Sequence, residues 1–115
     1  IGEGRNEAVM VLPHPIFNTR SDEVVRLAAA RRVPAIYPFR SYVEAGGLMS
    51  LGIDLPASFR RAAYFVDRIL KGAKPADLPM EQPNTIDLVV NAKSAKALGV
   101  TVPQSVLLRA DRVID

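Results

Sequence analysis

The side chains with the most versatile chemistry are scarce in this chain, which has one histidine, His14, and no cysteine. His14 stands between Pro13 and Pro15, with no carboxylate or nucleophile at the spacing of a known motif, so no catalytic triad can be assembled around it. Without cysteine there is neither thiolate chemistry nor a disulfide. We therefore expect no enzymatic activity. His14 is either an exposed loop residue or a hydrogen-bonding and stacking surface for a ligand.

Cofactor and metal sites are not expected either. Histidine and carboxylate residues do not cluster in the way that zinc or calcium sites require. The glycines at Gly46, Gly47 and Gly52 match neither a P-loop nor a dinucleotide-binding fingerprint, because no glycine-rich turn of the required spacing leads from a strand into a helix. We interpret them as turn residues.

The length and charge of the chain narrow the class of protein further. The 115 residues suit one domain, and 49% apolar with 23% charged residues is the balance of a globular protein. The formal charge is +3, but the basic residues are spread along the chain, so nucleic-acid binding is not expected. No apolar run approaches the roughly 20 residues needed to span a bilayer. The start lacks an initiator Met and a signal sequence, which predicts that residues 1–115 form a single partial domain of a longer protein.

Short apolar runs alternate with helical patterns along the chain, which predicts an α/β fold with a parallel sheet flanked by helices on both faces. The predicted strands are 8–12, 35–37, 48–51, 86–91 and 113–114. Strand 86–91 has one partly polar face, which favours an edge or a lobe boundary. The predicted helices are 21–32, one turn at 41–44 with a Ser41/Glu44 capping box, 54–70, 92–98 and 103–108.

The helix 54–70 has the clearest pattern. Asp54 is a good N-cap, and apolar residues recur at helical spacing through Phe59, Val66, Ile69 and Leu70. We expect these four side chains to be buried, each contributing about 1.5 to 3 kcal/mol. The substitution Phe59→Asp is accordingly expected to unfold this layer.

Candidate ligand-binding residues follow from the sheet, because ligands bind in the crevice at the carboxyl ends of parallel strands. Prolines at two of the predicted strand ends would hold the rim of a pocket rigid. Of Tyr37 and Phe39, one should lie in the core while the other can stack on a ligand. The predicted ligand-binding residues are Pro13, His14, Pro15, Asn18, Tyr37, Pro38, Phe39, Met49, Ser50 and Leu51.

Several segments together resemble a known family. They are Leu12-Pro13-x-Pro15-x-Phe17-Asn18, 34–38 (PAIYP), 44–50 (EAGGLMS), 68–79 (RILKGAKPADLP), 81–83 (EQP), 88–91 (LVVN), 96–99 (KALG) and Pro103. In combination they resemble the ABC transporter substrate-binding proteins related to the tryptophan- and tyrosine-binding lipoproteins, over essentially the whole chain.

The resemblance implies a type I periplasmic-binding-protein-like fold, in which two α/β lobes hold a small ligand between them. This chain resembles the C-terminal part, mostly the second lobe with its crossover segment. The implied function is the solute-binding component of an ABC-type uptake transporter, which binds an amino acid or related organic solute and delivers it to permease subunits. Many relatives carry an acidic residue at position 14 and a tyrosine at position 51, so His14 and Leu51 are departures that leave the ligand unnamed.

The resemblance also implies a place and partners. The implied location of the protein is the periplasm, or the cell exterior with a membrane anchor. The partners are a small-molecule ligand, the permease and a missing N-terminal lobe, and an isolated fragment can also form a homodimer. Two alternatives stay open: a ligand-sensing module of a signalling protein and a small α/β enzyme.

Overall fold

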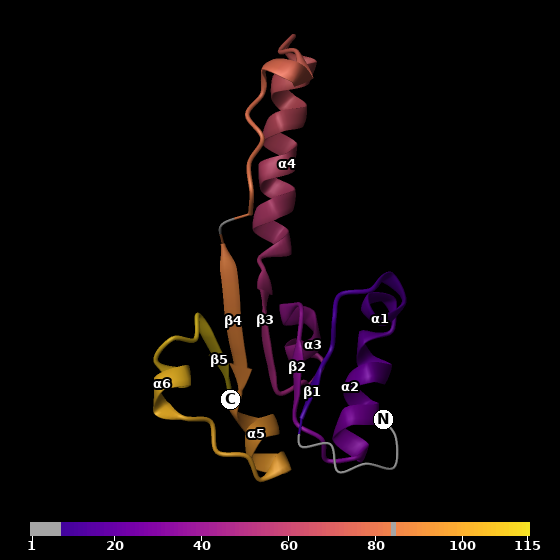
Figure 1. Ribbon diagram of the computed structural model, residues 1–115, viewed down its shortest axis with the longest axis vertical. Coiled ribbons are helices and arrows are strands. Elements are labelled where there is room, and N and C mark those ends of the chain that lie inside the picture. The colour runs from indigo at the N-terminus through magenta and orange to yellow at the C-terminus, as the bar shows by residue number, and fades with distance from the viewer. Residues whose placement is uncertain (1–7, 84) are drawn as a thin grey trace.

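The computed structural model describes residues 8–83 and 85–115, which form a five-stranded sheet in the order β1-β2-β3-β4-β5 (Figure 1). The strands are β1 Val9–Met10, β2 Ala35–Tyr37, β3 Met49–Ile53, β4 Ile86–Asn91 and β5 Arg112–Ile114. The predicted α/β class is confirmed. The sheet is mixed and not wholly parallel, because β4 runs antiparallel to β3 while the pairs β1–β2, β2–β3 and β4–β5 are parallel.

The helices connect these strands in chain order. They are α1 Pro15–Thr19, α2 Ser21–Ala30, α3 Arg40–Glu44, α4 Leu55–Leu70, α5 Ala92–Leu98 and α6 Gln104–Leu107, with a 3₁₀ turn, η1, at Pro75–Asp77. The predicted caps Asp54 and Asn91 are confirmed, since their side chains accept from the amides of Ala57 and Ser94 at 3.0 and 2.9 Å. Gly99 ends α5 in the left-handed conformation, at φ +70°.

The capping box predicted for α3 is wrong. The N-cap is Phe39 and makes no side-chain hydrogen bond, while Arg40 occupies the first helical position. The Glu44 carboxylate lies 3.3 Å from the Arg40 guanidinium, so it pairs with a cation and not with a backbone amide. The helix is confined to about one turn, as predicted.

The edge position considered for strand 86–91 is also wrong, because β4 pairs with β3 on one side and β5 on the other. Its partly polar face has another cause. Asp87 lies opposite Gly52 of β3, near the start of β4, where the chain returns to the sheet after α4 and η1. The carboxylate therefore stays within reach of solvent while Val89 and Val90 are fully buried.

The core lies between the sheet and the helices α2 and α3. Tyr37 from β2 stacks on Tyr42 from α3, with ring centroids 5.1 Å apart, and Val25 and Ala28 from α2 join them. Tyr42 and Val43 have no exposed surface. The five-residue helix α3 is therefore stabilised by packing on the sheet, because so short a helix is unstable alone.

Ser50 lies on the same buried side of the sheet and is 1% exposed. Within the described residues its hydroxyl has no hydrogen-bond partner. A buried unpaired hydroxyl is destabilising, so we expect Ser50→Ala to leave the free energy of unfolding unchanged or to raise it by up to about 1 kcal/mol. Urea denaturation checks this. A loss of more than about 1 kcal/mol would show that the hydroxyl is satisfied after all.

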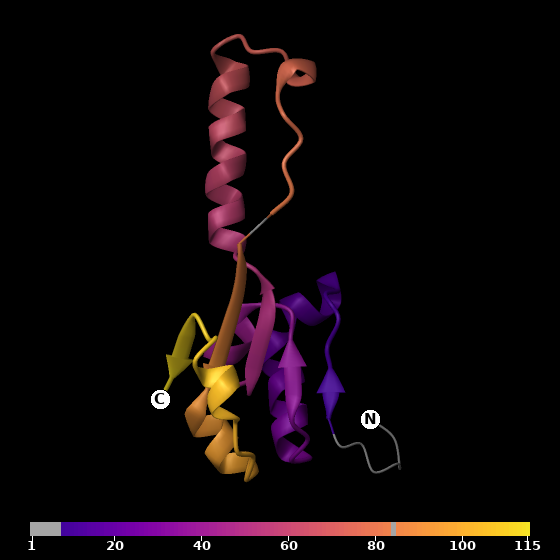
Figure 2. The ribbon, with the colours of Figure 1, turned by 60° about the vertical axis from the view of Figure 1, so that its left-hand side comes forward.

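Helix α4 and the segment 71–83 form an arm that projects beyond the sheet (Figures 1 and 2). The arm gives the molecule extents of 55 × 31 × 20 Å and a radius of gyration of 17.5 Å. A compact chain of this length would have a radius of gyration of about 13 Å.

The burial predicted for α4 is wrong in this structure. Phe59 is 72% exposed, Leu70 81%, Val66 54% and Ile69 40%. The apolar spacing along the helix is present, but residues 81–83 and Thr85 line α4 on the face that carries Arg61 and Phe65, away from most of the apolar stripe. The amphipathic pattern correctly predicted a helix, while its burial depends on a surface that these residues do not supply.

Candidate functional site

The carboxyl ends of β1, β2 and β3 lie at one edge of the sheet, because the three strands are parallel neighbours. This arrangement is the one on which the predicted ligand-binding residues depend. It is confirmed for the strands, and the individual residues differ in how they are placed.

Residues 12–20, which follow β1, are exposed and contain helix α1, where the sequence predicted only a loop. His14 is the N-cap, and its Nδ1 accepts from the amide of Ile16 at 3.3 Å. Pro15 takes the first helical position, where its missing amide costs nothing. Pro13, His14 and Pro15 are all exposed. The His-Pro pair was the overlooked signal for this helix start.

Asn18 connects this segment to the core. Its Oδ1 accepts a hydrogen bond from the buried Tyr42 hydroxyl at 2.8 Å, which holds α1 against α3. Asn18 is otherwise exposed. The side chain therefore has a structural partner, and any contact with a ligand would involve its remaining amide group.

The end of β2 supplies one buried and one partly accessible aromatic side chain. Tyr37 is 2% exposed and belongs to the core, where burial and the neighbouring Tyr42 raise the pKa of its hydroxyl. Pro38 is buried too. Phe39 is half-buried and lines a cavity, so it is the aromatic residue of this pair that can reach a ligand.

The third predicted group lies within β3 and not at its end, because the strand extends to Ile53 and not to Leu51. Met49 and Leu51 point to the face opposite Ser50, where Leu51 is 52% exposed. Ser50 is enclosed by the core. The strand end that meets Phe39 is formed instead by Ile53 and Asp54, which lay outside the predicted set.

A cavity of about 190 Å³ lies where the ends of β2 and β3 meet the start of β4. Its apolar wall comes from Phe39, Ile53, Leu55 and Pro56. Its polar lining comes from Arg40, Ser41, Glu44, Asp54 and Asp87. Apolar walls with a few convergent charges are the usual composition of a small-molecule site.

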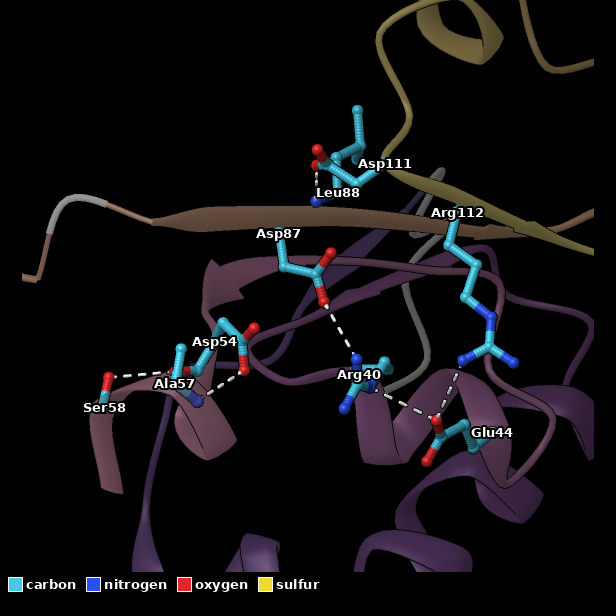
Figure 3. A network of polar contacts seen from close by, with 9 residues as sticks. All are labelled: Arg40, Glu44, Asp54, Ala57, Ser58, Asp87, Leu88, Asp111 and Arg112. Atoms are coloured by element: carbon cyan, nitrogen blue, oxygen red, sulfur yellow. Dashed lines mark hydrogen bonds and ion pairs between the residues drawn. The ribbon is translucent and has the colours of Figure 1, made fainter. Parts of the chain in front are cut away.

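The charges around this cavity form a connected network (Figure 3). The Arg40 guanidinium pairs with Glu44 at 3.3 Å and with Asp87 at 3.8 Å, and Arg112 approaches Glu44 at 3.8 Å. The Asp54 side chain already accepts a hydrogen bond as the N-cap of α4. The network joins α3 to β4 and β5, so it links the short helix at the rim to the strand that returns from the arm.

Asp87 is the least compensated carboxylate of this network. Its side chain is 19% exposed, and among residues 8–83 and 85–115 its one ion-pair partner is Arg40. Burial raises the pKa of the Asp87 carboxyl above its ordinary value. Arg40 opposes that rise in pKa, while Asp111 and Asp54 add to it. Sequence reasoning missed Arg40 and Asp87, although a cation three residues after a strand end was a usable signal.

A second and larger hollow, of about 530 Å³, lies along the arm between α4 on one side and residues 81–83 and Thr85 on the other. Glu81 and Arg61 close it with a bidentate ion pair, and the Arg61 guanidinium also lies 4.2 Å from the Tyr64 ring centroid. These contacts hold the returning segment against the helix. We place the candidate site at the smaller cavity because it lies at the strand ends.

The described residues contain neither a metal site nor a membrane-spanning helix. No group of three or more His, Asp or Glu residues is placed to hold a metal ion there. No helix in residues 8–83 and 85–115 is long and apolar enough to cross a membrane.

Comparison with protein families identifies the relationship. The model of the family described as ABC transporter substrate binding protein matches residues 3–114. The chain belongs to this family. The resemblance of the sequence motifs is thereby confirmed, and the family is one of substrate-binding proteins and not a class of enzymes. A search of curated proteins finds no match.

Solved structures agree with this membership in the ABC substrate-binding family. A conserved domain protein from Vibrio cholerae is 29% identical with a TM-score of 0.86, and the match covers 95% of this chain and 37% of that one. An ABC domain from Streptococcus pneumoniae in complex with L-Trp is 34% identical with a TM-score of 0.85, covering 96% of this chain and 38% of that one.

A more distant structure shares the fold. The ligand-free, open form of a substrate-binding protein with adhesive properties from Clostridium difficile is 24% identical with a TM-score of 0.60, covering 92% of this chain and 36% of that one. The present chain therefore spans less than two fifths of each solved protein.

Proposed function

We propose that this chain is part of the solute-binding component of an ABC-type uptake transporter, mostly its second lobe. It binds a small organic solute, of the amino-acid or a related class, in a cleft between two lobes. The binding protein lies in the periplasm, or outside the cell with a membrane anchor, and its closed form delivers the solute to permease subunits. Catalysis is not part of this role.

The observation that carries the proposal is the cavity at the shared edge of β2 and β3, within a chain of this family. A half-buried aromatic ring and a charged network face the space in which a ligand crevice is expected. The L-Trp complex of the Streptococcus pneumoniae domain supports the amino-acid class.

The test uses the whole polypeptide encoded by the reading frame that contains these residues. A thermal-shift screen would include amino acids, polyamines, sugars and organic acids. A solute at 100 times its dissociation constant stabilises the folded state by about 2.7 kcal/mol, which raises the Tm by several degrees. The 115-residue chain is the comparison. We expect it to bind the same solute weakly, because half of the enclosing surface is absent.

Two results would contradict the proposal. One is chemical conversion of a bound solute, which would indicate an enzyme. The other is micromolar binding by the 115-residue chain alone, which would show that no second lobe is needed to enclose the ligand.

The arm supports a second part of the proposal, namely that another lobe of the same polypeptide covers α4. The stripe of Phe59, Ala63, Val66 and Leu70 recurs at helical spacing on the side of α4 away from Arg61 and Phe65, which face the returning segment. Exposed apolar patches of this kind mark interfaces. The solved relatives are more than twice as long as this chain, which is enough for another lobe.

The substitution Phe59→Asp is expected to have different effects in the 115-residue chain and in the whole polypeptide. In the 115-residue chain we expect the free energy of unfolding to change by less than about 1 kcal/mol, because the ring is already in water. In the whole polypeptide we expect a loss of about 2 kcal/mol or more, since the ring is then buried. Chemical denaturation of both proteins measures the difference.

Val89→Asp is the control, because Val89 is fully buried in the sheet and a charge there should unfold either protein. Equal, small effects of Phe59→Asp in both settings would contradict coverage by a second lobe. Dimers of the short chain that this substitution converts to monomers would show that the stripe pairs with a second copy.

A further inference from the structure

The cavity at the ends of β2 and β3 contains more negative than positive charge. Arg40 is the one cation among the described residues that line it, against the carboxylates of Glu44, Asp54 and Asp87. Outside the lining, Arg112 and Asp111 add one charge of each sign. An anionic ligand would therefore meet net repulsion, while a cationic group would be attracted.

The three carboxylates differ in how far they are already satisfied. Asp54 accepts the amide of Ala57 at 3.0 Å, and Glu44 lies 3.3 Å from one arginine and 3.8 Å from another. Within the described part of the chain, Asp87 has a single arginine partner, at 3.8 Å, beyond direct hydrogen-bond distance. At 19% exposure it is also the most buried of the charged groups in the ion pairs of this network.

We propose that Asp87 is the residue that recognises a protonated primary amine on the solute, with Arg40 beside it to receive a carboxylate where the solute has one. An ammonium group would give Asp87 the charge-assisted hydrogen bonds that the described residues do not supply. The apolar wall of Phe39, Ile53, Leu55 and Pro56 accepts the carbon atoms next to that group. This inference rests on the proposed solute-binding function.

The size of the cavity limits what it can hold. At about 190 Å³ it is smaller than the roughly 300 Å³ at which pockets for whole ligands begin. The cavity therefore takes the amine-bearing end of the solute, and the rest extends towards the second lobe. The α-ammonium and α-carboxylate of an amino acid match the adjacent Asp87 and Arg40, whereas a simple amine uses Asp87 alone.

The experiment compares three molecules that differ only in their charged groups. They are L-tryptophan, tryptamine, which lacks the carboxylate, and indole-3-propionate, which lacks the ammonium. Each is titrated into the ¹⁵N-labelled 115-residue chain, and backbone amide shifts locate weak binding. We expect tryptamine and L-tryptophan to shift the amides around Phe39, Asp54 and Asp87. Indole-3-propionate should bind about tenfold more weakly or not at all.

Two variants with the same change of charge test whether the amine binds to Asp87. Asp87→Asn should weaken tryptamine binding about tenfold. Asp67→Asn, on the exposed arm where Asp67 pairs with Lys71, should leave it unchanged. The amide spectrum of each variant shows directly whether it is folded.

Three outcomes would overturn the inference. They are indole-3-propionate binding as tightly as tryptamine, unchanged tryptamine binding by folded Asp87→Asn, and no shift near the cavity with any of the three molecules at millimolar concentration. The thermal-shift screen of the whole polypeptide is independent of all three. A solute without an amine found in that screen would leave the transport role intact while ending the role given to Asp87.

Discussion

Replacing Tyr42 with alanine is expected to lower the free energy of unfolding by about 3 to 5 kcal/mol. Tyr42 has no exposed surface, stacks on Tyr37 with ring centroids 5.1 Å apart, and donates its hydroxyl to Asn18 at 2.8 Å. Removal of the ring leaves a cavity under α3 and an unpaired amide oxygen on α1. Since small domains are stable by about 5 to 15 kcal/mol, much of the stability would be lost.

Urea denaturation followed by circular dichroism measures this loss. Tyr42→Phe is the matched variant, because it retains the ring and removes only the hydrogen bond, so we expect it to cost about 1 kcal/mol. Tyr64→Ala makes the same truncation on the arm, where the ring is 43% exposed, and should cost no more than about 1 kcal/mol. Equal losses at positions 42 and 64 would show that α3 does not anchor the core.

The substitution Gly52→Ala is expected to destabilise the fold by about 3 kcal/mol, because a methyl group does not fit at this position. A Cβ atom at Gly52 would lie 1.8 Å from the carbonyl oxygen of Pro38 and 2.9 Å from its carbonyl carbon. Those atoms belong to the backbone, which cannot rotate away as a side chain would. The ends of β2 and β3 would have to separate, and the cavity rim at Phe39 would move with them.

Gly72→Ala provides the comparison. Gly72 has φ +99°, so alanine is strained there, but nothing lies within 4 Å of an added Cβ atom. The strain alone should cost about 1 kcal/mol. Thermal denaturation of both variants gives the two stabilities, and solute binding by the whole polypeptide should fall in any Gly52→Ala protein that still folds. A Gly52→Ala protein as stable as Gly72→Ala would contradict the close approach to Pro38.

Short-range signals located most of the secondary structure. The run Ala35 to Tyr37 was predicted to the residue, and the caps Asp54, Asn91 and Gly99 marked real helix ends. Such signals act within a few residues, so a chain carries them whatever surrounds it. The errors lie where a long-range partner intervenes. Glu44 pairs with Arg40 and Arg112 instead of capping its own helix.

The candidate site shows the same division. The sequence correctly indicated that the ends of three strands share an edge. Phe39, one of the predicted ligand-binding residues, lines the cavity at that edge. The sequence could not indicate that Asp87, which follows Arg40 by 47 positions, approaches that side chain to 3.8 Å. Such a pair depends on the register between β3 and β4, which is decided by the packing of the whole sheet.

The amino-acid sequence sufficed to predict the α/β class, the positions of most helices and strands, and the family to which the chain belongs, because local propensities and motifs encode these features. The tertiary structure decided which side chains are buried. It buried Ser50 and Tyr37 against α3, and it left the stripe on α4 in water. The physical reason is that hydrophobic periodicity indicates which face of a helix is apolar enough to pack against another surface, whereas burial requires that this second surface be present.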